Sequence, residues 1–219
     1  APPAGAPATA ALSSSGGAPG VAGETMLVPR VFAAPRTEVR IATERFDATF
    51  SSDGASATRW VLGKYENPLR KEPVNLIPDG QTALHVVVGV SGAAYDFSRA
   101  PFRVAGGSER EGRVSFIAED STGIRVTKTY RATEDAAILD VEVRIAAHPD
   151  LGAVRYRMGW ASPLPLTEQN SKPQELTATA YLGAKLETVD MNRIAKDGMR
   201  RLEGNVRWEG ERNKYFIAA

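Results

Sequence analysis

The sequence predicts a mainly β protein, a large antiparallel β-sandwich with at most one or two short helices. Apolar and polar side chains alternate with a period of two in many runs from Glu38 onward, as in half-buried strands. Turn-forming residues separate these runs at short intervals, and short connections favour antiparallel pairing. A helical pattern fits only residues 190–201. Roughly ten or more strands in one domain imply two packed sheets.

Residues 139–145 give the clearest strand signal. Aliphatic side chains occupy every second position, and Asp140, Glu142 and Arg144 lie between them. One face of this strand is therefore apolar and the other charged, which an amphipathic helix would not give. We expect each alternating apolar set to face a core. The sets are Val39/Ile41, Phe46/Ala48/Phe50, Val114/Phe116/Ala118, Ile124/Val126 with Tyr130, Leu139/Val141/Val143/Ile145 and Val154/Tyr156/Met158/Trp160.

Glycine, proline and aspartate mark the turns between the strands. A stretch rich in Pro, Ser, Gln and Asn at residues 162–175 predicts a long surface loop. Residues 190–201 predict the helix, with Asp190 as its N-cap, although Gly198 weakens the pattern. The expected turns are Asp53-Gly54, Pro78-Asp79-Gly80, Gly106-Gly107-Ser108, Ser121-Thr122-Gly123 and residues 148–152.

The N-terminal arm differs in composition from the rest of the chain. Residues 1 to about 23 are almost wholly Ala, Pro, Gly and Ser, with too little apolar surface to offset the entropy of ordering. They predict a flexible tether, which random-coil scaling gives a span of about 25 Å. Such an arm could serve as a spacer between an anchor and a folded body. It could equally be simply one end of the sequence without a role. Alternatively, Met26, Val28, Val31 and Phe32 could dock part of it onto the body or a neighbour.

Composition and charge exclude several function classes. The 27 basic and 26 acidic residues leave a net charge of +1 and are interleaved, so the basic stripe of a nucleic-acid groove is missing. The chain has no cysteine, which excludes disulfides and Cys-ligated metals. Its apolar runs, such as residues 84–90, are far shorter than the roughly 20 residues that cross a bilayer. Because the sequence starts without Met or an intact signal peptide, we expect a piece of a longer protein.

Candidate catalytic groups are few. His85 enters an apolar strand and His148 lies in a turn, and both positions are ordinary structural ones. No zinc-protease spacing, nucleophile elbow, P-loop or dinucleotide-binding glycine pattern occurs, and Ser108 is interpreted as a turn residue. The pairs Glu119-Asp120 and Glu134-Asp135 lie beside turns and are interpreted as solvated charges. We therefore expect a protein that is not an enzyme, with no catalytic residue, metal or cofactor.

Aromatic residues offer a possible binding site. Trp60, Tyr65, Tyr95 and Trp160 could line a cleft and stack on a sugar ring, with Trp60, Tyr95 and Trp160 as the cleft-binding candidates. Packing in a core is favoured for both tryptophans, because each lies in a strongly apolar run. A basic cluster, made of Arg193, Lys196, Arg200 and Arg201, could approach anionic lipid, although a solvated face explains it as well.

Two segments resemble the large periplasmic domain of the YidC family of membrane-protein insertases. Residues 40–65 have the order of that domain's opening: a Thr-Glu pair, an alternating strand, a glycine turn and an apolar strand that ends in Lys-Tyr. Gly54-Ala55 stands where paired glycines are common. Residues 206–219 resemble its closing Trp-x-Gly-x-x-x-Lys-Tyr-Phe segment through Trp208, Gly210, Lys214, Tyr215 and Phe216. The resemblance covers residues from about 38 to 219. Within this range, residues 102–104 and 126–130 also fit the pattern of the family.

The resemblance implies a β-supersandwich of galactose-mutarotase-like shape at residues 37–219, preceded by a linker at residues 1–36 that follows a membrane anchor outside this chain. It implies a domain in the periplasm, at the bacterial inner membrane, between the first and second transmembrane helices. The five closing residues are then structural and membrane-proximal. The implied partners are the Sec translocon components SecD and SecF and nascent membrane proteins, and the implied role is non-catalytic assistance of insertion and folding, alone or with the translocon.

Two other interpretations stay open. One is a periplasmic carbohydrate-binding or mutarotase-like protein on the same fold, which would need an acid and a base that converge in a cleft. The other has the terminal segments, with Arg212 and Lys214, in contact with a membrane surface. The sequence does not give the docking surface, a cleft ligand, the oligomeric state or the placement of the N-terminal arm.

Overall fold

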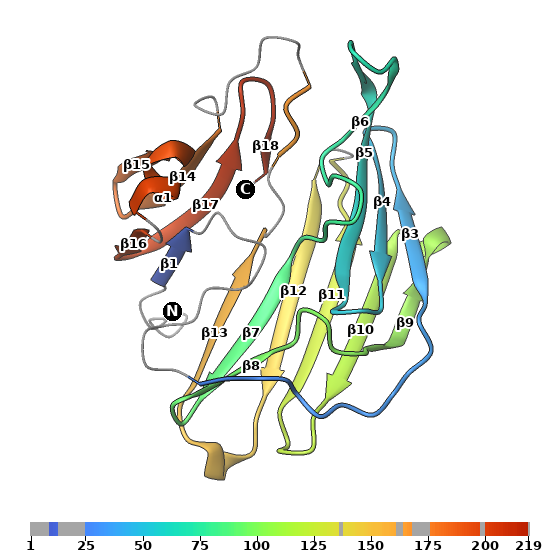
Figure 1. Ribbon diagram of the computed structural model, residues 1–219. Helices are drawn as coiled ribbons and strands as arrows, with labels where there is room; N and C mark the ends of the chain where they lie inside the picture. The colour runs from blue at the N-terminus through green and yellow to red at the C-terminus, as the bar shows by residue number, and fades with distance from the viewer. Residues whose placement is uncertain are drawn as a thin grey trace.

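The computed structural model describes residues 9–12, 25–135, 138–160, 164–167, 176–197 and 200–218. Over these residues the protein is mainly β, with one seven-residue α-helix and two short 3-10 turns, which confirms the predicted fold class. Figure 1 shows long strands side by side in the body and a smaller group of C-terminal strands at its upper left. No helix in this part of the chain is long and apolar enough to cross a membrane.

Two four-stranded antiparallel sheets form the body, and side chains from both fill the space between them. Consecutive strands pair because short turns join them, as in the continuous register of Arg113–Glu119 against Arg125–Arg131. The first sheet contains β3 (Glu38–Ala42), β4 (Phe46–Ser51), β5 (Ser56–Asn67) and β6 (Glu72–Asn75) in that order. The second contains β9 (Arg103–Ser108), β10 (Arg113–Glu119), β11 (Arg125–Ala132) and β12 (Leu139–Ala146) in that order.

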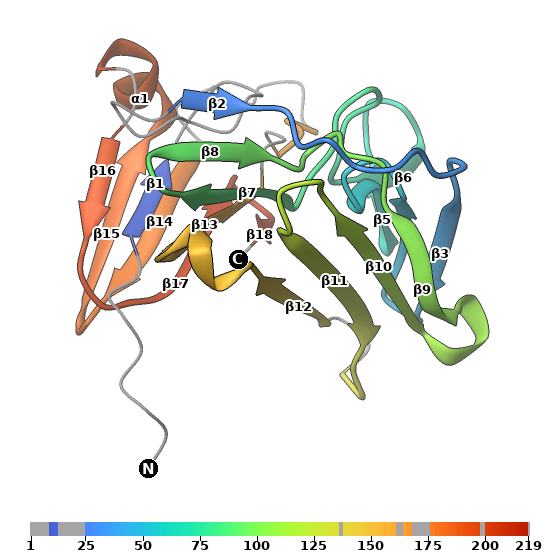
Figure 2. The same cartoon turned by 90° about the horizontal axis from the view of Figure 1, so that it is seen from below.

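A third sheet lies between the body and the C-terminal strands, as Figures 1 and 2 both show. Its central strand, β7, is apolar on both faces and buried from Val86 to Val90. The sheet is antiparallel except at β2, which runs parallel to β8. Its order is β13 (Val154–Gly159), β7 (His85–Val90), β8 (Ala93–Asp96) and β2 (Thr25–Leu27).

The C-terminal strands form a fourth sheet with its own small core. Ala178, Ala180 and Val189 of this sheet pack against Ile194 of α1 and Leu202 of β16. The helix begins as expected, because Asp190 Oδ1 accepts a hydrogen bond of 2.8 Å from the backbone N–H of Arg193. The sheet order is β15 (Lys185–Asp190), β14 (Thr177–Leu182), β17 (Val206–Arg212) and β18 (Ile217–Ala218). The helix is α1 (Met191–Asp197), and β1 (Thr9–Leu12) pairs with β16 (Arg200–Glu203).

The main core lies between the two body sheets and against β7. Its centre is aromatic: the ring of Phe50 stacks on Tyr130 at 4.2 Å and meets Trp60 edge-on at 6.4 Å. All members of the apolar sets predicted around β4, β10 and β11 are buried in this core. In β12 the predicted set is partly buried and packs on this core, while the charged set is exposed.

Three local expectations about strands and turns are wrong. Gly106-Gly107-Ser108 is the end of β9, and the turn follows at the 3-10 helix η1 (Glu109–Glu111). In β13 the apolar members Val154, Tyr156 and Met158 are exposed, because no element in the described part of the chain covers this face of the edge strand. Asp120 is buried and caps the Ser121–Gly123 turn by accepting hydrogen bonds from the backbone N–H groups of Thr122 and Ile124.

Residues 25–36 cross the outside of the body as the blue strand and trace in Figure 2. They contact it through β2 and through a bridge between Val31 and Asp120, which places Val28 and Phe32 in solvent. The boundary at residue 36 between linker and domain stays a prediction. The predicted surface loop at 162–175 is described only at 164–167, where Leu164 and Thr167 are buried. The predicted helix ends at Asp197, and residues 198–199 lie outside the described residues. The helix prediction is wrong at residues 200–201, which begin β16 (Arg200–Glu203).

Candidate functional site

Trp60 and Trp160 lie together where the body meets the C-terminal strands. Their ring centroids are 6.0 Å apart, and Trp60 also contacts Phe46 at 5.0 Å. Both tryptophans are partly buried against the main core and against a third cluster, which joins the body to the C-terminal sheet. The structure therefore uses these rings for packing. The third cluster contains Val74, Leu76 and Leu164, with Leu62, Leu176, Phe216 and Ala218 against it.

The other aromatic candidates lie elsewhere. Tyr95 is on β8, opposite Val88, and packs against the main core. Tyr65 is near the end of β5, where its ring meets Phe216 edge-on at 5.5 Å. Among the ring contacts in the described part of the chain, neither tyrosine touches a tryptophan, so the four do not share one stacking surface.

The closing motif forms the strand β17 and the turn after it. Trp208 stacks on Tyr181 of the neighbouring strand at 6.2 Å, and Gly210 pairs with Thr179 in the same ladder. In the turn, the ammonium of Lys214 lies 5.0 Å from the ring centroid of Tyr215, which is exposed. Phe216 instead points inward to the third cluster. The motif thus ties the C-terminal sheet to the body at one point and exposes a tyrosine and a lysine beside it.

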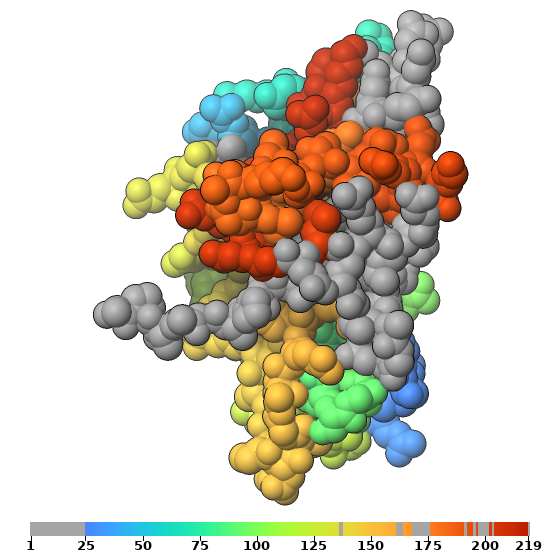
Figure 3. Space-filling model, turned by 90° about the vertical axis from the view of Figure 1, so that its left-hand side faces the viewer, coloured from blue at the N-terminus to red at the C-terminus, as the bar shows by residue number. Residues whose placement is uncertain are grey.

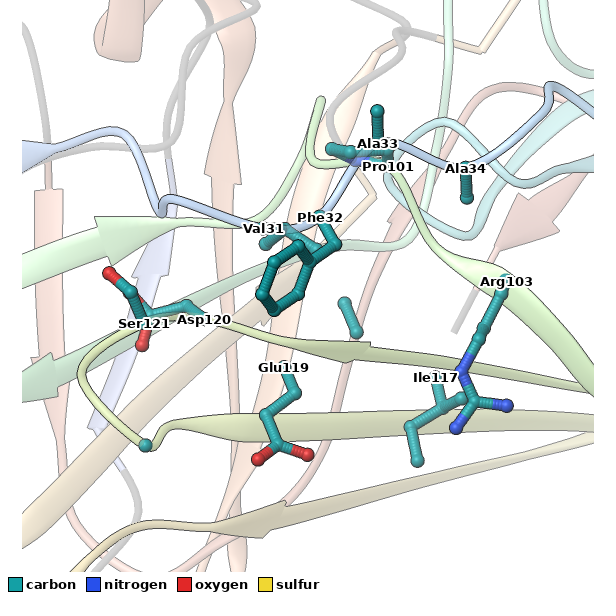
Figure 4. Close-up of a pocket in the computed structure, with 12 residues that line it drawn as sticks. Val31, Phe32, Ala33, Ala34, Pro101, Arg103, Ile117, Glu119, Asp120 and Ser121 are labelled. Atoms are coloured by element: carbon teal, nitrogen blue, oxygen red, sulfur yellow. The ribbon is translucent and has the colours of Figure 1, made fainter.

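A shallow groove of about 540 Å³ lies where residues 31–34 cross the body (Figure 4). The exposed ring of Phe32 covers part of it, and Arg103 and Glu119 reach it from β9 and β10. Glu119 pairs with Arg125 at 2.6 Å, and Asp120 is committed to its turn. Besides apolar side chains, the groove is lined by the guanidinium of Arg103, two carboxylates and the hydroxyl of Ser121. No hydrogen bond among the described residues joins this hydroxyl to a carboxylate, so the groove shows no activated nucleophile.

A buried lysine is the most unusual group in the body. Lys128 is fully buried, and its Nζ donates hydrogen bonds to the carbonyl oxygens of Gly54 at 3.1 Å and Leu84 at 2.6 Å. Tyr130, two residues along the same strand, donates its hydroxyl hydrogen bond to the carbonyl of Ala55. Burial lowers the pKa of Lys128 to about 7 and raises that of Tyr130. The Lys128 ammonium and the Tyr130 hydroxyl thus hold two loops against β11, one at residues 54–55 and one at Leu84.

Neither histidine lines the groove of Figure 4. His85 lies at the start of β7, and its Nε2 is 2.6 Å from Thr82 Oγ1. Burial lowers its pKa, and the nearby Lys128 lowers it further. His148 lies in the exposed turn at η2 (Pro149–Leu151), where its Nδ1 is 3.3 Å from an Asp150 carboxylate oxygen. Both side chains are exposed, and the backbone N–H of Asp150 donates a hydrogen bond of 3.4 Å to the same Nδ1, which caps the turn.

Two carboxylates of β17 are largely buried. Burial raises the pKa of Glu211 to about 7, and a hydrogen bond of 3.2 Å from the backbone N–H of Leu164 lowers it in part. Burial also raises the pKa of Glu209, which is two residues away on the same face of the strand. The bond from Leu164 lets Glu211 hold the C-terminal sheet against residues 164–167, whereas Oε2 of Glu209 is buried without a hydrogen-bond partner among the described residues.

We expect Glu211 to weaken the fold as the pH rises from about 4.5 to about 7. Its pKa is 4.5 in the unfolded chain and about 7 in the folded one, so between these values the folded protein binds more protons. The free energy of unfolding should therefore fall with pH over this window in the wild type and stay flatter in Glu211→Gln, which keeps the acceptor for Leu164. Urea unfolding curves at several pH values measure this. Parallel curves for the two proteins would contradict it.

The perturbed groups do not converge on a reaction centre. Lys128 and Tyr130 bind backbone carbonyls, and Glu211 binds a backbone amide. The described residues contain no group of three His, Asp or Glu side chains that could hold a metal ion. Lys128 shares the inward period-two face with Val126 and Tyr130, and this pattern could have shown its burial. The sequence gives no such signal for Glu209 and Glu211, because they alternate with Val206, Trp208 and Gly210, and this alternation would place the carboxylates on the solvent face.

Comparison with known proteins identifies one family. The family model described as the YidC periplasmic domain matches residues 38–219. The membrane protein insertase YidC of Chloroherpeton thalassium is 26% identical over 194 residues, which cover 83% of this chain and 33% of that protein. The insertase YidC of an Anaeromyxobacter species is 28% identical over 206 residues, with 85% of this chain and 36% of that protein covered. The chain spans about a third of the length of these curated relatives.

Two solved structures also match this chain. A galactose mutarotase related enzyme from Lactobacillus acidophilus matches with a TM-score of 0.48 and 12% identity, covering 81% of this chain and 74% of that one. A putative aldose 1-epimerase from Escherichia coli K12 matches with a TM-score of 0.43 and 12% identity, covering 68% of this chain and 56% of that one.

Proposed function

This chain belongs to the family of YidC periplasmic domains, and from that premise we propose that it is the non-catalytic periplasmic domain of a membrane-protein insertase. In this role it assists the insertion and folding of membrane proteins, alone or together with the Sec translocon. The observation that carries the proposal is the extent of the family match, which runs from β3 to the end of the C-terminal sheet and so includes both core-forming units.

The chemistry of the described residues supports a scaffold rather than a reaction centre. The groups with strongly shifted pKa values are buried and bound to backbone atoms, so they stabilise the packing of loops and sheets. A binding role needs exposed contact residues instead. The third sheet offers these on its edge strand β13, where Tyr156 is the most exposed of three apolar side chains.

We propose SecD, SecF and nascent membrane proteins as the partners. Photo-crosslinking in cells tests this with the full-length insertase, which carries a photoreactive amino acid in place of Phe32, Tyr156 or Leu186. All three side chains are exposed, so the replacements leave the cores intact. We expect at least one position to give a covalent adduct with SecD, SecF or a membrane protein. The Sec adduct should vanish in cells that lack SecD and SecF.

Two results would overturn the proposal. One is the absence of any such adduct from all three positions. The other is accelerated interconversion of sugar anomers by the purified chain in a polarimeter, which would indicate a sugar-acting enzyme.

A further inference from the structure

Two turns from distant parts of the sequence lie side by side at one end of the molecule. The first joins β5 to β6 and the second joins β17 to β18. They appear together at the top of Figures 1 and 3. The edge-on contact between Tyr65 and Phe216, with centroids 5.5 Å apart and planes at 90°, links them directly. The two turns therefore present one continuous surface, which we call the turn surface: residues 64–72 and 212–217.

An asparagine fixes the backbone of each turn in the same way. Asn67 Oδ1 accepts hydrogen bonds from the N–H groups of Leu69 at 2.9 Å and Arg70 at 3.3 Å. Asn213 Oδ1 accepts from Tyr215 at 2.9 Å and Phe216 at 2.8 Å. Asn213 is itself buried and donates through Nδ2 to the carbonyl of Pro165 at 2.9 Å. Both turns are thus fixed by their own hydrogen bonds.

These fixed turns hold apolar side chains out in solvent. Tyr65, Leu69, Tyr215 and Ile217 are each between 50% and 54% exposed, although Phe216 between two of them is packed inward. A cluster of exposed apolar groups is costly unless something covers it, and such clusters mark interaction sites. Because the backbone is already fixed, little conformational entropy is lost when the cluster is covered.

Charge distinguishes among possible occupants. The turn surface carries five cations, Lys64, Arg70, Lys71, Arg212 and Lys214, against the two carboxylates Glu66 and Glu72, so its net charge is 5 − 2 = +3. The carboxylates make only exposed pairs, Arg70 with Glu72 at 3.6 Å and Lys71 with Glu66 at 4.0 Å, which are weak in water. Tyrosines with a polar tip, aliphatic side chains and surrounding cations match the headgroup region of an anionic bilayer.

We propose that the turn surface rests on an anionic lipid bilayer and so sets how the domain stands on the membrane. This deepens the proposed function, since that function places the domain beside a membrane. Tyr65, Leu69, Tyr215 and Ile217 enter the headgroup region, and the cations around them bind lipid phosphates.

Vesicle binding by the purified chain tests the proposal. We expect co-sedimentation with vesicles that contain phosphatidylglycerol and much less with pure phosphatidylcholine. Each near-surface cation contributes roughly fivefold to binding, so Arg70→Gln/Lys71→Gln should bind about 25-fold more weakly. The matched control is Arg110→Gln/Arg113→Gln, which removes two exposed cations, one from the turn after β9 and one from the start of β10, and should bind as the wild type.

A second measurement reports which end meets the lipid. The natural chain has no cysteine, so Leu69→Cys and Asp150→Cys each accept a single environment-sensitive dye. Asp150 belongs to the exposed turn η2, at the opposite end of the strands in Figure 1. We expect phosphatidylglycerol vesicles to shift the dye emission to the blue at position 69 and to leave it unchanged at position 150.

The remaining outcomes contradict the proposal. Equal vesicle binding by both double variants, or equal dye shifts at both positions, would remove the turn surface from the contact. A dye shift at position 69 that requires SecD and SecF, or that grows with the concentration of the chain alone, would assign the surface to a protein partner or a second copy. None of these results depends on the crosslinks that test the insertase role, so the two proposals can fail separately.

Discussion

The free energy of unfolding should rise by about 1.4 kcal/mol per pH unit between about pH 7 and about pH 9.5 through Lys128 alone. Its pKa is 10.5 in the unfolded chain and about 7 in the folded one. Between these values the unfolded chain holds a proton that the folded protein has released, so a higher pH favours the folded state. Below pH 7 Lys128 is protonated in both the folded and the unfolded state, so its contribution to the free energy of unfolding does not change with pH. Above this window Tyr130, with its raised pKa, acts in the opposite direction.

Lys128→Met isolates this effect, because methionine has a similar length and no titrating group. Chemical denaturation of both proteins across the pH window gives the difference between their free energies of unfolding. We expect this difference to shift steadily in favour of the wild type as the pH rises. A difference that does not change with pH would mean that the folded protein accommodates the charged ammonium, with the carbonyls of Gly54 and Leu84 as sufficient partners.

Phe50→Ala should lower the free energy of unfolding by roughly 3–5 kcal/mol. The Phe50 ring is fully buried between the body sheets, where it stacks on Tyr130 and meets Trp60. Its removal leaves a cavity that these two rings cannot both fill. Phe32→Ala is the matched control, since that ring is 90% exposed and its loss should change stability by less than about 0.5 kcal/mol. Thermal and urea unfolding of both variants measure this, and similar losses in the two would contradict the assigned core.

The period-two pattern was sufficient to predict the body strands because burial there follows the local sequence. In β12 the charged and aliphatic residues alternate without exception, and the structure exposes the charged set. Asp190 likewise predicted the start of α1, since an N-cap depends on the three residues that follow it.

The same pattern fails where long-range packing decides which face is inside. β13 alternates as regularly as β12, yet Tyr156 is exposed because nothing in the described part of the chain covers that face of an edge strand. In β17, Trp208 is partly exposed while Glu209 and Glu211 lie inside, since residues 164–167 pack onto that face. The turn surface could not be predicted from the sequence either, because Tyr65 and Tyr215 are 150 positions apart and only the fold brings their turns together.

The central claim, that this domain serves an insertase by binding partner proteins, is tested most directly by co-isolation. The full-length insertase and a variant with residues 38–219 replaced by a flexible Gly/Ser linker would be purified from membranes at equal expression, and the SecD and SecF that accompany each would be quantified. The account predicts that both components accompany the intact protein and are largely lost from the variant. Equal amounts with both proteins would contradict it.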